Sequence, residues 1–274
     1  MVPNILPNWV RLVLSILTAA SYLPQHHRIR EQGHCDGLSL YYLLFNLISA
    51  TEQFAIGLFL HVNDNGFPRP DVFVHDPATA GDWFNFAQLA VVWICSLSLF
   101  LDSLRHAAER DYRRDHRRAV SAIYLVFLLI SLVPFTLDAL QPPTRSESRR
   151  WAEEILLLAH HLLILPLSTI LTIAAAVPQA RAILFTRPET SALSLPCLAA
   201  QAVVFALVAI SWMVRVEYPP YLPSWGEWYR LIGWPVVNNG LFASVQGVLL
   251  LVALRSGAGD GGGSVTVERR VLLG

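Results

Sequence analysis

The chain has 274 residues, of which 54% are hydrophobic and 15% are charged, and its formal net charge is zero. A soluble domain carries about 25% charged residues, so this composition excludes an ordinary soluble globular protein. All of its basic residues are arginines, which excludes chemistry that needs a lysine, such as Schiff-base formation.

Seven apolar blocks follow one another along the chain, and each is close to the roughly 20 residues that a membrane-spanning helix needs. They cover about 6–25, 38–60, 83–104, 119–140, 154–177, 194–216 and 229–254. We therefore predict an all-α integral membrane protein with seven transmembrane helices, embedded in a lipid bilayer.

The arginines are distributed unevenly between the two sides that seven spans define. The loops after the first, third and fifth blocks, together with the tail, hold thirteen of the twenty. Because cytoplasmic loops carry the excess of basic residues, we predict a lumenal or extracellular N-terminus and a cytosolic C-terminus.

The Gly-rich tail is predicted to be disordered. Near its end, Glu268, Leu272 and Leu273 form an acidic dileucine pattern. On the cytosolic side, clathrin adaptors would read such a pattern as a sorting signal. It favours a vacuolar or lysosomal membrane over the plasma membrane.

A proline–glutamine pair ends both the first and the fifth block, as Pro24-Gln25 and Pro178-Gln179. Each pair is followed by a Leu-Ser-Leu sequence that opens the next block, at 38–40 and at 193–195. The prolines are 154 residues apart and the Leu-Ser openings 155. This constant shift indicates one helix–loop–helix unit written twice in the same orientation.

These motifs resemble the PQ-loop repeat family, which includes cystinosin, lysosomal cationic amino-acid exporters and, more distantly, the SWEET sugar transporters. Asn46 midway along the second block and Asp82 at the opening of the third add to the resemblance, which covers helices 1–3 and 5–7. It implies a 3+1+3 architecture, with two parallel triple-helix bundles joined by helix 4, and the transport of small solutes. The implied domains are a first bundle at 1–104, a basic loop with the linker helix at 105–153, a second bundle at 154–254 and the tail at 255–274.

Pro24 and Pro178 each lack an N–H, so the carbonyls of Ala20 and Ala174 lose their helical partners and the helices are expected to bend. We predict a hinge or gate at both positions. The neighbouring Gln25 and Gln179 are expected to satisfy the freed backbone groups. The alternative interpretation is a proline that merely ends a helix.

Amide and hydroxyl side chains mark the predicted solute site. Asn46, Ser49 and Gln53 share one face of the second block, and the repeat shift carries Asn46 onto Gln201. With Gln88 and Asn239, they predict a midplane site between the bundles. The alternative is hydrogen bonding between helices without a solute.

The titratable and charged residues within the blocks predict a function less directly than the amides do. Proton-coupled relatives have an Asp where this chain has Gln201, so coupling by that route is not expected. Asp82 is interpreted as a proton carrier, a helix N-cap or both. Glu52 lies near the middle of a span and is expected to contact Arg11 at similar depth, in a structural or a proton-carrying role. The pair His160-His161 is either an acid sensor or a partly solvated helix end.

We expect a small-solute transporter, of the amino-acid or sugar class, that works by alternating access about the two Pro-Gln hinges. The alternative is a non-transporting receptor or sorting protein on the same scaffold, which the KDEL receptor resembles. No metal cluster, nucleophile triad or phosphate loop is visible in the sequence. An enzyme, a metal, a cofactor and a nucleic-acid partner are therefore not expected.

Overall fold

The computed structural model describes residues 6–63, 73–75, 77–106, 111–141, 147–187, 190–216 and 224–271, and within them it is all-helical. The first four helices are α1 (Asn8–Gln32), α2 (Leu40–Leu58), α3 (Ala80–His106) and α4 (Asp111–Ala139), and α2 continues as a π-helical turn, η1 (Phe59–Asn63). A fifth helical stretch consists of α5 (Glu147–Ala159), η2 (His160–Ile164), α6 (Leu165–Ala174) and α7 (Ala176–Phe185). It is followed by α8 (Leu195–Trp212) and by a last stretch of α9 (Trp225–Trp228), η4 (Tyr229–Gly233) and α10 (Trp234–Val271).

Six of the seven helical stretches are long and apolar enough to cross a membrane, which makes the chain a multi-pass integral membrane protein. They are Leu40–Val62, Ala80–His106, Asp115–Ala139, Glu147–Phe185, Leu195–Trp212 and Trp225–Ser256. The remaining helix, α1, is 25 residues long. Its mean hydropathy is lower because it carries Arg11 and several hydroxyl and amide side chains.

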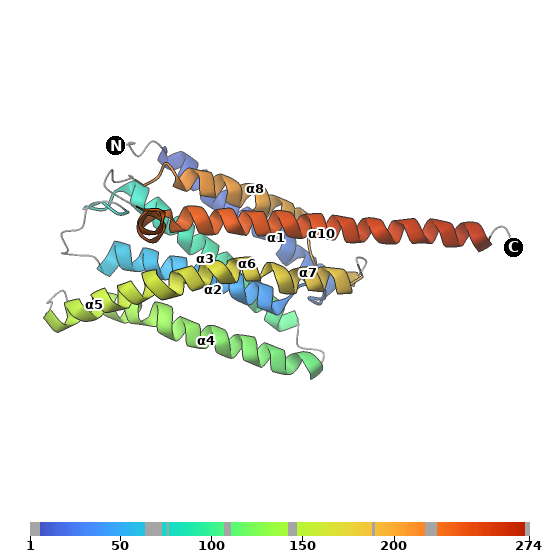
Figure 1. Ribbon diagram of the computed structural model, residues 1–274, viewed down its shortest axis with the longest axis horizontal. Coiled ribbons are helices and arrows are strands. Elements are labelled where there is room, and N and C mark those ends of the chain that lie inside the picture. The colour runs from blue at the N-terminus through green and yellow to red at the C-terminus, as the bar shows by residue number, and fades with distance from the viewer. Residues whose placement is uncertain are drawn as a thin grey trace.

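The helices pack in the same order in the two halves of the chain. In the first half, α3 packs against both α1 and α2; in the second half, α10 packs against α8 and against α6 and α7. The halves meet where α1 contacts α8 and α2 contacts α6. The first helix of each half therefore packs on the second helix of the other, while α4 lies at the edge of the bundle beside α2 (Figure 1).

Alternating helix directions give the bundle two distinct ends. We call the end with Gln25 and Gln179 the Pro-Gln end, and the opposite end, where α3 begins, the Asp82 end. A large apolar cluster, which includes Tyr22, Leu47 and Phe205, joins both halves. A second cluster surrounds Trp212 and Trp234. Exposed Leu and Ile side chains along α4 suit contact with lipid tails, which are as apolar as these side chains.

The two Leu-Ser openings form equivalent helix caps. The Ser39 hydroxyl accepts a hydrogen bond from the Tyr42 N–H at 3.4 Å, and the Ser194 hydroxyl accepts one from the Cys197 N–H at 3.3 Å. A serine at this position satisfies one of the N–H groups that a helix start leaves unpaired. The duplicated Leu-Ser motif is therefore a duplicated N-cap that starts α2 and α8.

The C-terminal segment extends α10 past the other helices (Figure 1). Side chains are described as far as Ser256, so the sorting signal at Glu268, Leu272 and Leu273 lies outside the described side chains. The disordered tail at 255–274 and the other domain boundaries stay predictions, although the helical backbone is drawn to Val271.

Candidate functional site

A small cavity lies between the two halves of the chain. The space open to the centre of a water molecule is about 20 Å³, which is enough for about one water molecule. The cavity in this structure is therefore too small to hold an amino acid or a sugar. The first half lines the cavity with Tyr22, Asn46, Ser49, Ala50, Gln53, Val92 and Ser96, and the second half with Thr172, Phe205, Asn238, Asn239 and Phe242.

Two amides from opposite halves bring unpaired polar atoms to this cavity. Asn46 donates from Nδ2 to the Tyr42 carbonyl at 3.0 Å, but its buried Oδ1 has no partner. Asn238 accepts from the Thr169 hydroxyl at 2.6 Å, but its buried Nδ2 has no partner. One free acceptor and one free donor suit a polar solute that carries both kinds of group.

Four of the six predicted solute-binding residues line the cavity, namely Asn46, Ser49, Gln53 and Asn239. Gln88 instead connects α3 to α1, because it donates to the Thr18 hydroxyl at 2.8 Å and accepts from the Ser15 hydroxyl at 2.9 Å. Gln201 is buried on α8 and is not among the lining residues.

At the Pro-Gln end, each glutamine of a Pro-Gln pair bonds to the loop of the other half. Gln25 donates from Nε2 to the Ala192 carbonyl at 2.7 Å, and its Oε1 accepts from the Ser194 N–H at 2.9 Å. Gln179 donates to the Gly37 carbonyl at 2.8 Å and accepts from the Ser39 N–H at 2.9 Å. We call these two pairs of hydrogen bonds the Gln clasps.

The Gln clasps explain why each repeat has both a glutamine after its proline and a Leu-Ser opening, because the glutamine of one repeat bonds to the opening of the other. A carboxamide has a donor and an acceptor side by side, and the loop offers a carbonyl and an N–H two residues apart. Gly37 has a positive φ of 82°, and a Cβ there would collide with the Ser191 side chain. Glycine therefore allows the two loops to approach each other. The expectation that Gln25 and Gln179 satisfy carbonyls of their own helices is wrong, because both bond across the repeats.

The two prolines have different effects on their helices. α1 runs through Pro24 without interruption. The equivalent stretch of the second half is interrupted at Ala175, between α6 and α7 and three residues before Pro178. Proline removes one backbone hydrogen bond in either case. Only the second site shows the interruption that a hinge would produce.

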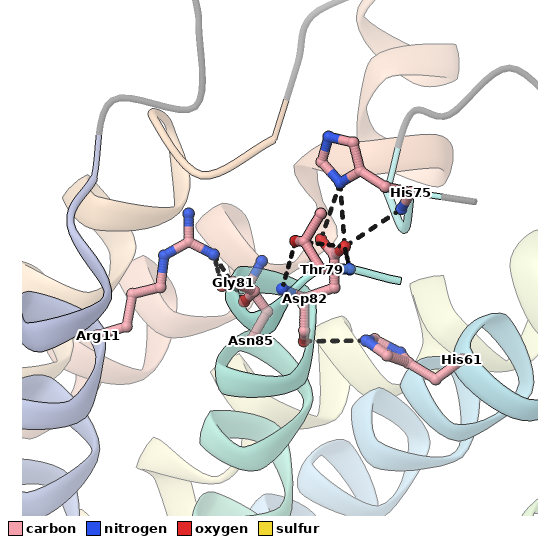
Figure 2. A network of polar contacts seen from close by, with 7 residues as sticks. All are labelled: Arg11, His61, His75, Thr79, Gly81, Asp82 and Asn85. Atoms are coloured by element: carbon pink, nitrogen blue, oxygen red, sulfur yellow. Dashed lines mark hydrogen bonds and ion pairs between the residues drawn. The ribbon is translucent and has the colours of Figure 1, made fainter. Parts of the chain in front are cut away.

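Asp82 is buried at the start of α3, and its carboxylate is fully engaged (Figure 2). Oδ2 accepts from the Thr79 N–H at 2.8 Å and from the Thr79 hydroxyl at 2.7 Å, and the Asp82 N–H lies 3.3 Å from that hydroxyl. This is a reciprocal capping box, with Thr79 as the N-cap and Asp82 as the residue that reaches back. The ring of His75 adds a contact of 3.0 Å from Nδ1.

The predicted contact between Glu52 and Arg11 is wrong. Arg11 donates from Nη1 to the Gly81 carbonyl at 2.6 Å and to Asn85 Oδ1 at 3.1 Å (Figure 2). Arg11 therefore connects α1 to the start of α3. The helical rise gave similar depths for Arg11 and Glu52, but depth does not say which neighbouring helix a side chain faces.

Glu52 instead joins three helical stretches. Its Oε1 lies 2.8 Å from His160 Nδ1, and its Oε2 accepts from the Ser131 hydroxyl at 2.7 Å. Glu52 and His160 are both 0% exposed, and the Phe135 ring packs on His160 at 4.6 Å between centroids. His160 is thus a buried partner of Glu52, so the expectation of a partly solvated helix end is wrong for this residue.

Three functional candidates at the Asp82 end were missed in the sequence. The His61 ring lies between two helices, with Nδ1 2.7 Å from the Gly57 carbonyl oxygen. Its Nε2 lies 2.9 Å from the Asp82 carbonyl oxygen (Figure 2). His75 contacts Asp82, and Arg215 contacts Asn85 at 3.4 Å. These three residues lie at the ends of apolar blocks or in a loop. A polar residue is ordinary at such a place, so the sequence pattern does not indicate a functional role for it.

The fold and the cavity together define a multi-pass helical membrane protein whose two halves enclose a polar centre. Residues 7–64 match the family model described as PQ loop repeat. The match spans α1, the first Pro-Gln pair and α2, so the chain carries a PQ-loop repeat, and the resemblance to the PQ-loop family is confirmed for this segment. No curated protein and no solved structure matches the chain significantly.

Proposed function

We propose that this chain is a membrane transporter of a small polar solute of the amino-acid or sugar class. The observation that carries the proposal is the central cavity, which both halves line with amide and hydroxyl groups and which has one unpaired acceptor and one unpaired donor. In this proposal the helices form a 3+1+3 arrangement, with α4 as the linker. The cavity groups bind a solute, and we propose no enzymatic step, cofactor or nucleic-acid partner.

Alternating access would follow from the Gln clasps. They hold the two halves together at the Pro-Gln end by four hydrogen bonds, each with a net value of about 1 kcal/mol. A total of about 4 kcal/mol is large enough to close this end and small enough to be overcome when a bound solute favours the open state. The interruption at Ala175, near Pro178, gives the second half a place to bend.

The orientation of the protein in the membrane is proposed from its arginines, and the choice of membrane from the pattern in its tail. We propose that the Pro-Gln end faces the cytosol, because the loops on that side carry most of the arginines. The Asp82 end then faces a lumen. The dileucine pattern of the tail supports a vacuolar or lysosomal membrane and recognition by a clathrin adaptor.

The proposed transport is facilitated rather than proton-driven. Gln201 cannot titrate, and Asp82 is held in a capping box. Glu52 is enclosed with His160, and neither is among the residues that line the cavity. No carboxylate is among the described lining residues, so the cavity suits a solute whose polar groups bind amides and hydroxyls.

Flux measurements in proteoliposomes test the proposal. We expect saturable flux of at least one member of an amino-acid and sugar panel, with the same rate in the presence and absence of a pH gradient. Asn46→Ala and Asn238→Ala should each reduce it, because each removes an unpaired cavity group. Ser244→Ala, an exposed hydroxyl on the same helix as Asn238, is the control. Gln201→Ala should have little effect. Absence of flux for the whole panel would reject transport.

The second candidate is a non-transporting receptor or sorting protein. It is favoured by one observation, that the Asp82 end carries a buried polar network of its own, separate from the cavity (Figure 2). A receptor would bind its ligand there while the Gln clasps stay closed. Ligand binding to the purified protein without any flux would support this candidate.

A further inference from the structure

Three side chains from two helical stretches meet beside the central cavity. Thr169 lies on α6, Tyr229 begins η4, and Asn238 lies on α10. The Thr169 hydroxyl oxygen is 2.5 Å from the Tyr229 hydroxyl and 2.6 Å from Asn238 Oδ1. Asn238 is 2% exposed and lines the cavity, whereas Thr169 and Tyr229 are half-buried and are not among its described lining residues. Of the three, Asn238 is therefore the one that a solute in the cavity can contact.

A π-helical turn allows Tyr229 and Asn238 to reach the same neighbour. The two residues are nine positions apart, which is about two and a half turns of a regular α-helix and would place them on opposite faces. The turn η4 begins at Tyr229, and a π-helical turn holds more residues than an α-helical one, so it changes this relation. Both side chains consequently contact Thr169.

The contact distances fix the direction of the Asn238 amide. An N–H···O hydrogen bond is about 2.7–3.2 Å long, and an O–H···O hydrogen bond is about 2.5–3.0 Å long. The contact of 2.6 Å therefore joins two oxygens, with the Thr169 hydroxyl as donor and Asn238 Oδ1 as acceptor. The amide nitrogen of Asn238, Nδ2, then points away from Thr169, and it is buried without a partner.

Tyr229 favours this direction of the Thr169 proton. Thr169 has one hydroxyl proton and two acceptors within reach, Asn238 Oδ1 at 2.6 Å and the Leu165 carbonyl at 3.0 Å. The Leu165 carbonyl is also the farther partner of the Tyr229 hydroxyl, at 3.4 Å. When Tyr229 donates to Thr169, consecutive hydrogen bonds run from Tyr229 through Thr169 to Asn238, and such bonds strengthen one another.

We propose that Thr169 and Tyr229 are positioning residues, which hold the Asn238 amide so that Nδ2 is the donor offered to a solute in the cavity. The first half offers the opposite group, because Asn46 donates to a carbonyl of its own helix and leaves Oδ1 as an acceptor. Asn46 is thus held by its own helix, whereas Asn238 is held by a different helical stretch. The proposal rests on the proposed function in one respect, that Asn238 binds the transported solute.

Flux of L-serine and of D-glucose into proteoliposomes tests the role of Thr169. Thr169→Val keeps the shape of the side chain but removes the hydroxyl, so the amide is free to turn. The KM of a transported probe should rise about five-fold, the equivalent of one hydrogen bond, with little change in the maximal rate. Thr169→Ser should keep the original KM. Thr136→Val is the matched control, because the exposed Thr136 hydroxyl donates to a carbonyl of its own helix.

Two further variants show whether Thr169 acts through Asn238. Tyr229→Phe should raise the KM by a smaller factor, about two-fold, because Thr169 keeps its proton but loses the neighbour that directs it. In the Asn238→Ala background, Thr169→Val should have no further effect on the KM. An unchanged KM in Thr169→Val would overturn the proposal. So would an equal rise in Thr169→Ser or an undiminished rise in the Asn238→Ala background.

NMR of the purified full-length protein with isotope-labelled asparagine tests the positioning without a solute. The side-chain amide signal of Asn238 is identified by its absence in Asn238→Ala. This signal should shift in Thr169→Val and in Tyr229→Phe and stay in place in Thr136→Val. If Thr169→Val does not fold, Tyr229→Phe decides, because it removes a single oxygen. A shifted signal without flux of either probe keeps the positioning role and counts against transport, whereas flux with an unshifted signal rejects the positioning role and keeps transport.

Discussion

The two Pro-Gln units have nearly identical hydrogen bonds but different helices. The first Gln clasp has distances of 2.7 and 2.9 Å and the second 2.8 and 2.9 Å. However, α1 is continuous through Pro24, whereas α6 and α7 are separated at Ala175. The amide contacts are therefore the common property of the repeat, while the helix interruption is confined to the second half. The glutamine of the motif therefore connects the halves in both repeats, whereas the proline is accompanied by a helix interruption in the second repeat alone.

The halves differ in charge as well as in backbone. Glu52 and Asp82 lie in the first half, and His160 and Arg215 lie in the second. Buried polar side chains of the first half contact buried polar side chains of the second half. Glu52 contacts His160, and Asn85 contacts Arg215. The Gln clasps are thus equivalent in the two halves, whereas the contacts of Glu52 with His160 and of Asn85 with Arg215 have no counterpart of the same residue types.

The largest expected effect comes from removing both Gln clasps. In the double variant Gln25→Ala/Gln179→Ala, four buried backbone groups lose their partners, at about 1–3 kcal/mol each. We expect a Tm decrease of about 8 °C or more by thermal unfolding, using about 2 °C for each kcal/mol, with about half of it in each single variant. Gln141→Ala, at an exposed position, is the control. A strongly unequal effect of the two single variants would show that the clasps are not equivalent.

The next largest effect concerns the contact between Glu52 and His160. His160→Ala leaves a buried carboxylate with one remaining described partner, the Ser131 hydroxyl, so we expect a loss of about 3–5 kcal/mol in the free energy of unfolding. The neighbouring His161→Ala should cost much less, because His161 is only half-buried and its Nδ1 contacts a carbonyl of its own helical stretch, that of Leu157. Denaturant or thermal unfolding of both variants measures the difference. Equal losses would mean that the contact between Glu52 and His160 adds no stability beyond that of an ordinary histidine at this depth.

Substitution of the two prolines should show the asymmetry of the helix interruption. Pro178→Ala restores an N–H and favours a continuous helix across Ala175, which would displace Gln179 from its clasp. We expect a several-fold loss of flux in this variant and a smaller loss in Pro24→Ala, because α1 is already continuous. Solute flux in proteoliposomes checks both. A larger loss in Pro24→Ala would place the functional hinge in the first half.

The smallest effect is expected at the two N-caps. Ser39→Ala and Ser194→Ala each remove one capping hydrogen bond, at a cost of about 1 kcal/mol. This corresponds to a Tm decrease of about 2–4 °C in each variant. The two decreases should be equal within error, since the caps are equivalent. Ser244→Ala, on the exposed face of α10, should leave the Tm unchanged.

Some of this protein was fixed by its sequence. The length and apolarity of the blocks specify membrane helices, since a bilayer leaves backbone groups no other partners. The constant shift between the Pro-Gln pairs specifies a duplicated unit, and the Leu-Ser openings specify its caps. The face shared by Asn46, Ser49 and Gln53 follows from the helical period, and all three line the cavity.

Only the tertiary structure decided which faces meet. The helical period gives the face of each helix on which a residue lies, but it says nothing about which neighbouring helix packs there. Glu52 therefore contacts His160 rather than Arg11, and Gln25 bonds to a loop that lies far away in the sequence. The meeting of Arg11 and Arg215 on Asn85 likewise depends on how the two halves pack. Packing between halves, rather than local preference, makes the polar contacts from which this protein's function is inferred.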